Sequence, residues 1–240
     1  RSYLPLESLA IRVKKVNGRW TSYEPWSLQL WFRVYSEMAQ EINQKQPHLV
    51  WVDCEMTGLD AQKDVLVEIA VLITDSDLNI IGDGVDVVIR ATEDQIAGMN
   101  EFVTKMHTES GLITEIPKGI SVSDAEELIL KYLETSGVAP GKSPLAGNSV
   151  YVDRIFISRD MPKLSEYLHY RTIDVSSIKE LTRRWYPKVY FNAPNKTGNH
   201  RALGDIKDSI AELAFYRKTV FVEQPGPQSA DIKQIASEFN

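Results

Sequence analysis

The stretch from Leu49 to Leu59 constrains this chain more than any other. It has the apolar, β-branched composition of a buried strand, and a Thr-Gly pair follows as a turn. Asp53 and Glu55 interrupt it, and the alternation of side chains along a strand predicts both on one face, with Cys54 on the other. Paired acids at the end of an apolar strand favour a divalent cation with oxygen ligands, such as Mg²⁺. The alternative is an Asp53 that caps the turn and a Glu55 in a surface salt bridge.

Two later patches carry side chains that suit the same kind of site. Asn148 ends a short predicted strand, and Asp153 falls in the first turns of the next predicted helix, where α/β sheets place ligands. His200 and Asp205 stand at the start of a later predicted helix, behind a loop rich in Pro, Asn and Gly. Positions five apart do not share a helical face. We therefore expect Asp205 to face the sheet and His200 to lie at the mouth of the helix, where loop mobility suits a base that closes over substrate.

Each of these side chains also has an ordinary interpretation. Asp153 suits a first helical turn because it compensates the helix dipole. His200 would then be a surface histidine at a helix start, and Asp205 would pair with Lys207 or Arg201. Taken singly, the ordinary interpretations are the better ones, and only the combination favours catalysis.

Net charge and cysteine content limit which ligands and which cell compartment suit this protein. The net charge is −6 over 240 residues, which argues against a protein that coats long nucleic acid but not against one that grips a few phosphates. The single cysteine excludes an intrachain disulfide and suits a reducing compartment, so we expect a cytoplasmic protein. No run approaches the roughly 20 apolar residues of a membrane span.

The first 47 residues differ from the rest. They hold three of the five tryptophans and carry seven basic against four acidic residues. From Pro25, helical spacing of apolar residues predicts an amphipathic helix to about Gln44, after a short, frayed beginning. The predicted organisation is an extension at 1–47, one domain at 48–225 and a C-terminal tail at 226–240. A targeting peptide and a protein-interaction role remain alternatives for the extension.

The remaining periodicity predicts one mixed α/β sheet surrounded by helices. Three strands joined by short turns come first, as an antiparallel meander, and helix-strand units follow. The predicted strands lie within 49–59 and at 65–74, 78–90, 145–148 and 170–174. The predicted helices lie at 92–107, from 121 or 123 to 133, at 150–159, through 178–185 and at 201–216.

The three patches, in this order, resemble the DEDDh branch of the DnaQ-like 3′→5′ exonucleases. Four segments narrow the resemblance to the oligoribonuclease family: WVDCEMTGL at 51–59, PLAGNS at 144–149, HYRTIDVS at 169–176 and RWYP at 184–187. The resemblance covers about residues 48–225, and the segment 221–227 looks most like actinobacterial members. It implies a ribonuclease H-like fold, with a mixed five-stranded sheet flanked by helices.

The chemistry that the resemblance implies is phosphodiester hydrolysis from the 3′ end of RNA. Four carboxylates would hold two Mg²⁺ or Mn²⁺ ions about 4 Å apart, and His200 would take the proton of the attacking water near neutral pH. The products would be nucleoside 5′-monophosphates. The four expected metal ligands are Asp53, Glu55, Asp153 and Asp205.

The resemblance also implies very short substrates, dinucleotides above all. Members of the family are similar in closing off the 5′ phosphate with a cap of polar side chains, and an arginine fork suits a phosphate best. The family forms homodimers, in which the Tyr170-Arg171 position reaches the neighbouring active site. The matching cap positions here are His107, Ser149, Arg171 and Ser176, and the matching base-contacting positions are Leu59 and Tyr170.

Ordinary roles and rival functions remain for these residues. Tyr170 would also suit interface packing, the serines would suit helix capping, and His107 would suit the surface. One rival function is an exonuclease that acts on longer chains, against which the absence of a basic stretch and the presence of the cap residues count. The other is a dinucleotide sensor without catalysis, against which the complete set of acids and His200 counts.

Overall fold

The computed structural model describes residues 14–16, 19–21, 46–195 and 201–239. Contacts divide the chain into two units, Arg1–Gln46 and Pro47–Asn240. In the first unit, β1 (Lys14–Val16) and β2 (Arg19–Thr21) pair antiparallel, where the sequence favoured no strand. The amphipathic helix expected at 25–44 and the expected base His200 lie outside the described residues.

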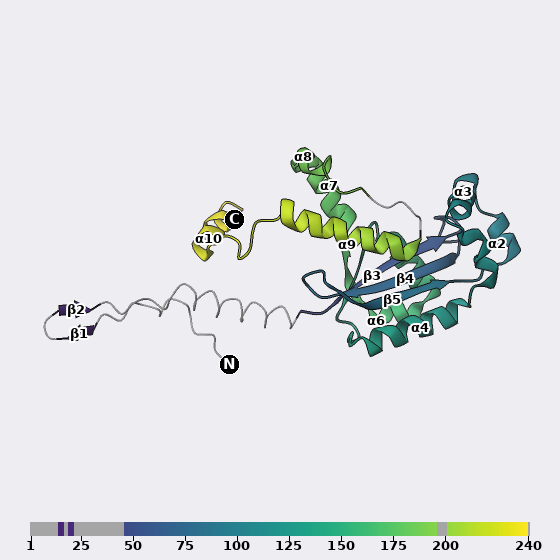
Figure 1. Cartoon of the computed structure of the whole chain (residues 1–240), viewed down its shortest axis with the longest axis horizontal. Coiled ribbons are helices and arrows are strands. Elements are labelled where there is room, and N and C mark those ends of the chain that lie inside the picture. Colours follow the sequence, from purple (N-terminus) through teal and green to yellow (C-terminus); the bar gives the residue numbers. More distant parts are fainter. Residues whose placement is uncertain (1–13, 17–18, 22–45, 196–200, 240) are drawn as a thin grey trace. The chain divides into compact units, whose positions relative to one another are not determined.

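The second unit is built around a five-stranded mixed sheet, as the sequence predicted (Figure 1). Its order is β5-β4-β3-β6-β7, with β3, β4 and β5 antiparallel and β6 and β7 parallel to β3. The expected meander is therefore confirmed. The strands are β3 (Leu49–Met56), β4 (Leu66–Thr74), β5 (Ile80–Val88), β6 (Pro144–Gly147) and β7 (His169–Asp174).

Helices cover both faces of this sheet, and the side chains of β3 alternate between them. Val50, Val52 and Cys54 pack into the core beneath α4 (Val122–Thr135), α5 (Tyr151–Asp160) and α6 (Pro162–Tyr167). Trp51 packs on the other face against α9 (Ala202–Thr219), which lies across the strands in Figure 1. The residues that follow Trp51 on its face, Asp53 and Glu55, therefore come to lie beneath the start of α9.

Several elements differ from the prediction. The helix expected at 92–107 is two helices, α2 (Glu93–Ala97) and α3 (Glu101–Glu109), because Asn100 caps a new helix by accepting a hydrogen bond from the Val103 amide. The expected C-terminal tail contains a helix, α10 (Ser229–Ser237), none of whose residues is buried. The other elements are η2 (Leu112–Thr114), η3 (Ile116–Lys118), α7 (Val175–Trp185) and α8 (Pro187–Tyr190). Among the described residues, no helix is both long and apolar enough to cross a membrane.

Candidate active site

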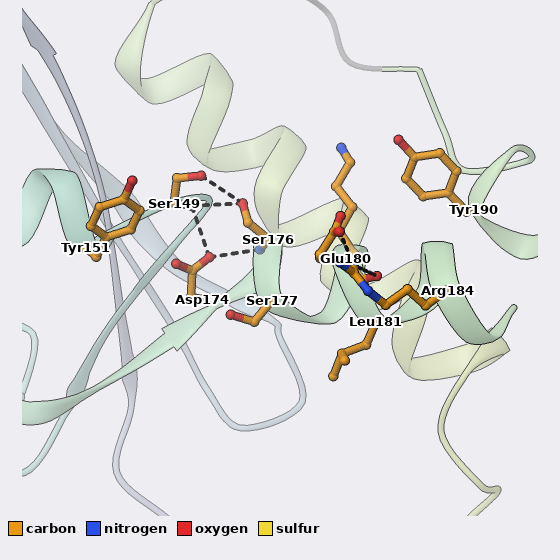
Figure 2. Close-up of a pocket in the computed structure, with 10 residues that line it drawn as sticks. Ser149, Tyr151, Asp174, Ser176, Ser177, Glu180, Leu181, Arg184 and Tyr190 are labelled. Carbon is orange, nitrogen blue, oxygen red and sulfur yellow. Dashed lines mark hydrogen bonds and ion pairs between the residues drawn. The ribbon is translucent and has the colours of Figure 1, made fainter. Parts of the chain in front are cut away.

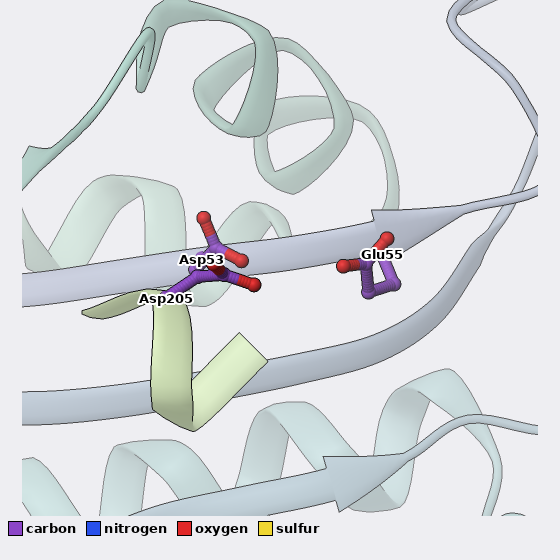
Figure 3. Close-up of side chains that lie close together, drawn as sticks. All are labelled: Asp53, Glu55 and Asp205. Carbon is purple, nitrogen blue, oxygen red and sulfur yellow. The ribbon is translucent and has the colours of Figure 1, made fainter. Parts of the chain in front are cut away.

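Asp53 and Glu55 lie near the end of β3 on the face that α9 covers, and Asp205 reaches them from the first turn of α9. One carboxylate oxygen from each of the three side chains lies within 4.8 Å of the other two (Figure 3). The pairing of β3 with β4 shifts register between Glu55 and Met56, an irregularity that often redirects side chains beside active sites. The structure thus brings together three of the four acids that the sequence singled out.

The environment of Glu55 shows how costly this arrangement is without a cation. Its side chain is buried, and burial, together with the neighbouring Glu68, Asp205 and Asp153 carboxylates, raises its pKa to about 8. Like charges this close oppose ionisation of one another. Oxygen ligands in such a cluster match Mg²⁺ and Mn²⁺, which are hard ions, so these residues fit a divalent metal.

Asp153 lies next to this cluster rather than inside it. It is the third residue of α5, 6% exposed, and its Oδ1 accepts a hydrogen bond of 2.8 Å from the backbone amide of Cys54. Cys54 lies between Asp53 and Glu55, so the bond anchors α5 directly to the end of β3 that carries these two carboxylates. Burial raises the pKa of Asp153 to about 7, against the lowering effect of its backbone hydrogen bonds.

An ion pair that the sequence analysis did not find fixes the start of α9. Arg201 Nε donates to Glu68 Oε1 at 2.8 Å, and Arg201 Nη2 lies 3.0 Å from Glu115 Oε2. Glu68 is the third residue of β4 and is fully buried, and its other oxygen accepts from the Ala202 amide at 3.1 Å. The network holds the residues that directly follow His200 and precede Asp205. A carboxylate inside the apolar run of β4 was the only sequence signal.

Two of the predicted cap residues lie together beyond the C-terminal end of β6. Ser149 and Ser176 lie with their hydroxyl oxygens 3.1 Å apart, and Asp174 Oδ1 accepts from both of their backbone amides (Figure 2). They line a pocket of about 690 Å³, to which α7 contributes Lys179 and Arg184.

The other four predicted substrate residues are not gathered in this pocket. Tyr170 and Arg171 lie on β7, with the guanidinium carbon 5.5 Å from the ring centroid, and Leu59 is 76% exposed after β3. His107 is fully buried, so it is not the surface residue that was the alternative. Its Nε2 bonds the Met56 carbonyl at 2.9 Å, and its Nδ1 has no hydrogen-bond partner in the described structure.

The metal-free protein is expected to lose stability as the pH rises from about 5 to 8. The folded chain keeps protons on Glu55 and Asp153, whose pKa values are about 8 and about 7, at pH values where the unfolded chain has released them. Since metal ligands must be deprotonated, Mn²⁺ or Mg²⁺ should stabilise the protein more at pH 8.5 than at pH 6. At 100 times Kd we expect a rise in Tm of about 5–10 °C. Differential scanning calorimetry at both pH values, with and without metal, measures this.

The matched control for this experiment is Glu55→Gln, which should be more stable than the wild type in metal-free buffer at pH 8 and should lose most of the metal response. An equal metal response at both pH values would contradict the assignment of these carboxylates as ligands.

Comparison with known proteins gives one consistent result. A family model described as exonuclease matches residues 50–213. An oligoribonuclease of Streptomyces griseus is 56% identical over 192 residues, covering 80% of this chain and 96% of its own. One of Mycobacterium avium is 57% identical over 193 residues, covering 80% and 90%.

Solved structures share the fold. Escherichia coli exonuclease I, in a complex with single-stranded DNA, superposes with a TM-score of 0.58 at 15% identity, over 73% of this chain. Exonuclease I of Methylocaldum szegediense gives a TM-score of 0.53 at 21% identity, over 72% of this chain. The chain spans about two fifths of the length of each of these two, 41% in both cases.

Proposed function

Since this chain belongs to the oligoribonuclease family and is a 3′→5′ exoribonuclease that degrades short RNA, we propose that its preferred substrate is a dinucleotide with a 5′ phosphate. The hydrolysis is supported by the convergence of Asp53, Glu55 and Asp205, with Asp153 one backbone amide away. The preference for a short substrate is supported by the pocket that Ser149 and Ser176 line. These four acids would hold two ions, Mg²⁺ or Mn²⁺. The products are nucleoside 5′-monophosphates.

Each acid has a part in the hydrolysis. When bound, the two ions supply Lewis acidity, which lowers the pKa of the attacking water and stabilises the charge that develops on the leaving 3′ oxygen. Asp53 on β3 and Asp205 on α9 would hold an ion between these two elements, and Glu55 would release its proton to solvent to serve as a further ligand. His200 accepts the proton of the attacking water, a role that suits its pKa range.

Substrate length is set by the cap. Ser149 and Ser176 line the pocket in Figure 2, where a 5′ phosphate would bind. Arg171 supplies a fork with two parallel donors. His107, the remaining cap position, is buried and donates its Nε2–H to the Met56 carbonyl at the end of β3. Leu59 and Tyr170 are both highly exposed and pack against the bases of the substrate. Contacts of this kind do not select a base sequence.

We propose a homodimer, in which Tyr170 and Arg171 of one copy reach the active site of the other. β7 is an edge strand of the sheet, and Tyr170 on it is 74% exposed. Trp185 at the end of α7 is 65% exposed. An unpaired edge strand and exposed aromatic side chains are unfavourable in a monomer and are typical of an interface. A purely monomeric species at micromolar concentration in sedimentation equilibrium would contradict this. We also place the enzyme in the cytoplasm, where the single buried thiol of Cys54 stays reduced.

A time course on 5′-phosphorylated RNAs of two to seven nucleotides with Mg²⁺ tests the proposed substrate. The dinucleotide should be cut much faster than the heptamer, and Arg171→Ala should lose mainly this preference, by about 10-fold or more, since a charged hydrogen-bond donor to phosphate is removed. The matched control is Arg90→Ala, at an exposed position after β5. Equal rates on all lengths would indicate a general exonuclease. Tight binding without cleavage would indicate a sensor.

A further inference from the structure

Asn148, the residue that follows β6, forms hydrogen bonds in two directions. Its Nδ2 donates to Ser209 Oγ at 2.8 Å and to Glu212 Oε2 at 3.1 Å, both on α9. Its Oδ1 accepts from Ser176 Oγ at 3.0 Å, on α7. One side chain thus connects the helix that carries Asp205 to the serines of the cap.

The partners of Asn148 determine which way its amide faces. Glu212 is 6% exposed, and its Oε1 accepts from both Lys179 Nζ and the Tyr216 hydroxyl at 3.0 Å, so its carboxylate acts as an acceptor. Ser209 Oγ donates to the carbonyl of Asp205 at 2.8 Å, so it accepts from Asn148. Only the Nδ2 group can meet these two acceptors, and the Oδ1 therefore faces Ser176.

This orientation assigns different roles to the two serines. A hydroxyl has one proton, and that of Ser176 is committed to Asn148 Oδ1. Ser176 Oγ in turn accepts from the Ser149 amide at 2.9 Å and lies 3.1 Å from Ser149 Oγ. The Ser149 hydroxyl is then the one whose proton can turn from Ser176 to a phosphate oxygen.

The backbone of Ser149 is held in an uncommon conformation by the same groups. Its φ is +53°, in the left-handed region that a non-glycine residue seldom adopts. Its amide is held by Ser176 Oγ and by Asp174 Oδ1, at 2.9 and 3.0 Å. Strained residues of this kind persist where the surroundings fix them, often at ligand clamps.

We propose that Asn148 is a positioning residue that fixes Ser176 as an acceptor and Ser149 as the donor to the 5′ phosphate. Asn148 also donates to Ser209, which donates to the Asp205 carbonyl on α9. The Asn148 amide therefore links the serines that line the cap to the helix that carries Asp205. The inference rests on the proposed role of Ser149 and Ser176 in binding a 5′ phosphate.

The test compares kcat/KM for one dinucleotide with and without its 5′ phosphate. The wild type should prefer the phosphorylated form, and both Ser149→Ala and Asn148→Ala should reduce this ratio by about 10-fold or more, as expected for a lost hydrogen bond to a charged group. The double variant should lose little more than either single variant, because both act on one interaction. The control is Asn79→Ala, in the exposed turn between β4 and β5, which should keep the wild-type ratio.

A polarity exchange covers the case in which Asn148→Ala folds poorly. Asn148→Asp still accepts from Ser176 but places a carboxylate against Glu212, so it should lose the preference. Adding Glu212→Gln supplies an amide donor to the new carboxylate and should restore most of it. Failure of this rescue would contradict the assigned orientation.

The outcomes separate the inference from the function on which it rests. A normal ratio in Asn148→Ala, with a reduced ratio in Ser149→Ala, would overturn the positioning role and leave the phosphate cap standing. Equal loss on both substrates in Asn148→Ala would show a purely structural role and overturn it as well. A wild type without preference, unaffected by Ser149→Ala, would overturn the cap and the inference together.

Discussion

Asp53→Ala is expected to lower kcat/KM for a 5′-phosphorylated dinucleotide by at least about 10²–10³-fold, the loss typical when a group that organises transition-state charge is removed. One carboxylate oxygen of Asp53 lies within 4.8 Å of one from Glu55 and one from Asp205, and without it Glu55 is the one carboxylate of this cluster left on β3 to share an ion with Asp205 on α9. Single-turnover assays with saturating Mg²⁺ or Mn²⁺ measure the effect on the chemical step.

A second variant separates lost chemistry from lost folding. Asp53→Asn keeps the shape of the side chain and removes a negative charge from the carboxylate cluster, so its Tm in metal-free buffer should not fall below that of the wild type. Its activity should be lost as in Asp53→Ala. The matched control is Asp83→Asn on β5, where the side chain is exposed and activity should stay normal. Activity near that of the wild type in Asp53→Asn would contradict the metal-site proposal.

Arg201→Met is expected to destabilise the protein by about 3–5 kcal/mol, the usual cost of leaving one partner of a buried ion pair uncompensated. The Glu68 side chain that it abandons is fully buried and would keep the Ala202 amide and the Asp86 side chain as partners, neither of which carries a positive charge. For a chain of this size the loss corresponds to a fall in Tm of about 6–20 °C. Thermal and urea unfolding measure it.

Two further variants establish the cause of this effect. Arg217→Met, near the other end of α9, breaks an exposed pair with Asp77 and should cost no more than about 1 kcal/mol. Glu68→Gln in the Arg201→Met background removes the stranded charge and should recover part of the stability. If both arginine variants cost the same, the buried Glu68 would not be the reason.

Periodicity predicted most of the fold because each strand and helix shows its own pattern. The alternation along β3 placed Cys54 in one core and the two acids on the opposite face, and the structure confirms this. The break at Asn100 was missed because apolar residues continue at helical spacing on both sides of it. The helix at 229–237 buries no side chain, so the sequence has no pattern of buried apolar residues that could predict it.

The candidate site was predictable where single residues carry the chemistry. Asp53, Glu55 and Asp205 could be named because carboxylates at the ends of buried elements need a reason to be there. The Glu68–Arg201 pair could not, because its members are separated by 133 residues and nothing local links them. The same holds for Asn148, whose partners on α9 lie 61 and 64 residues away.

The sequence by itself determined the class of fold, the faces on which the acids lie and the family. Only the tertiary structure decided which polar groups hold those acids in place, because the partners of a buried polar group depend on how α9 docks across the sheet. Burial makes an unpaired charge or amide costly. Docking α9 against β4 and β6 therefore both creates the need for Arg201 and Asn148 and supplies their partners.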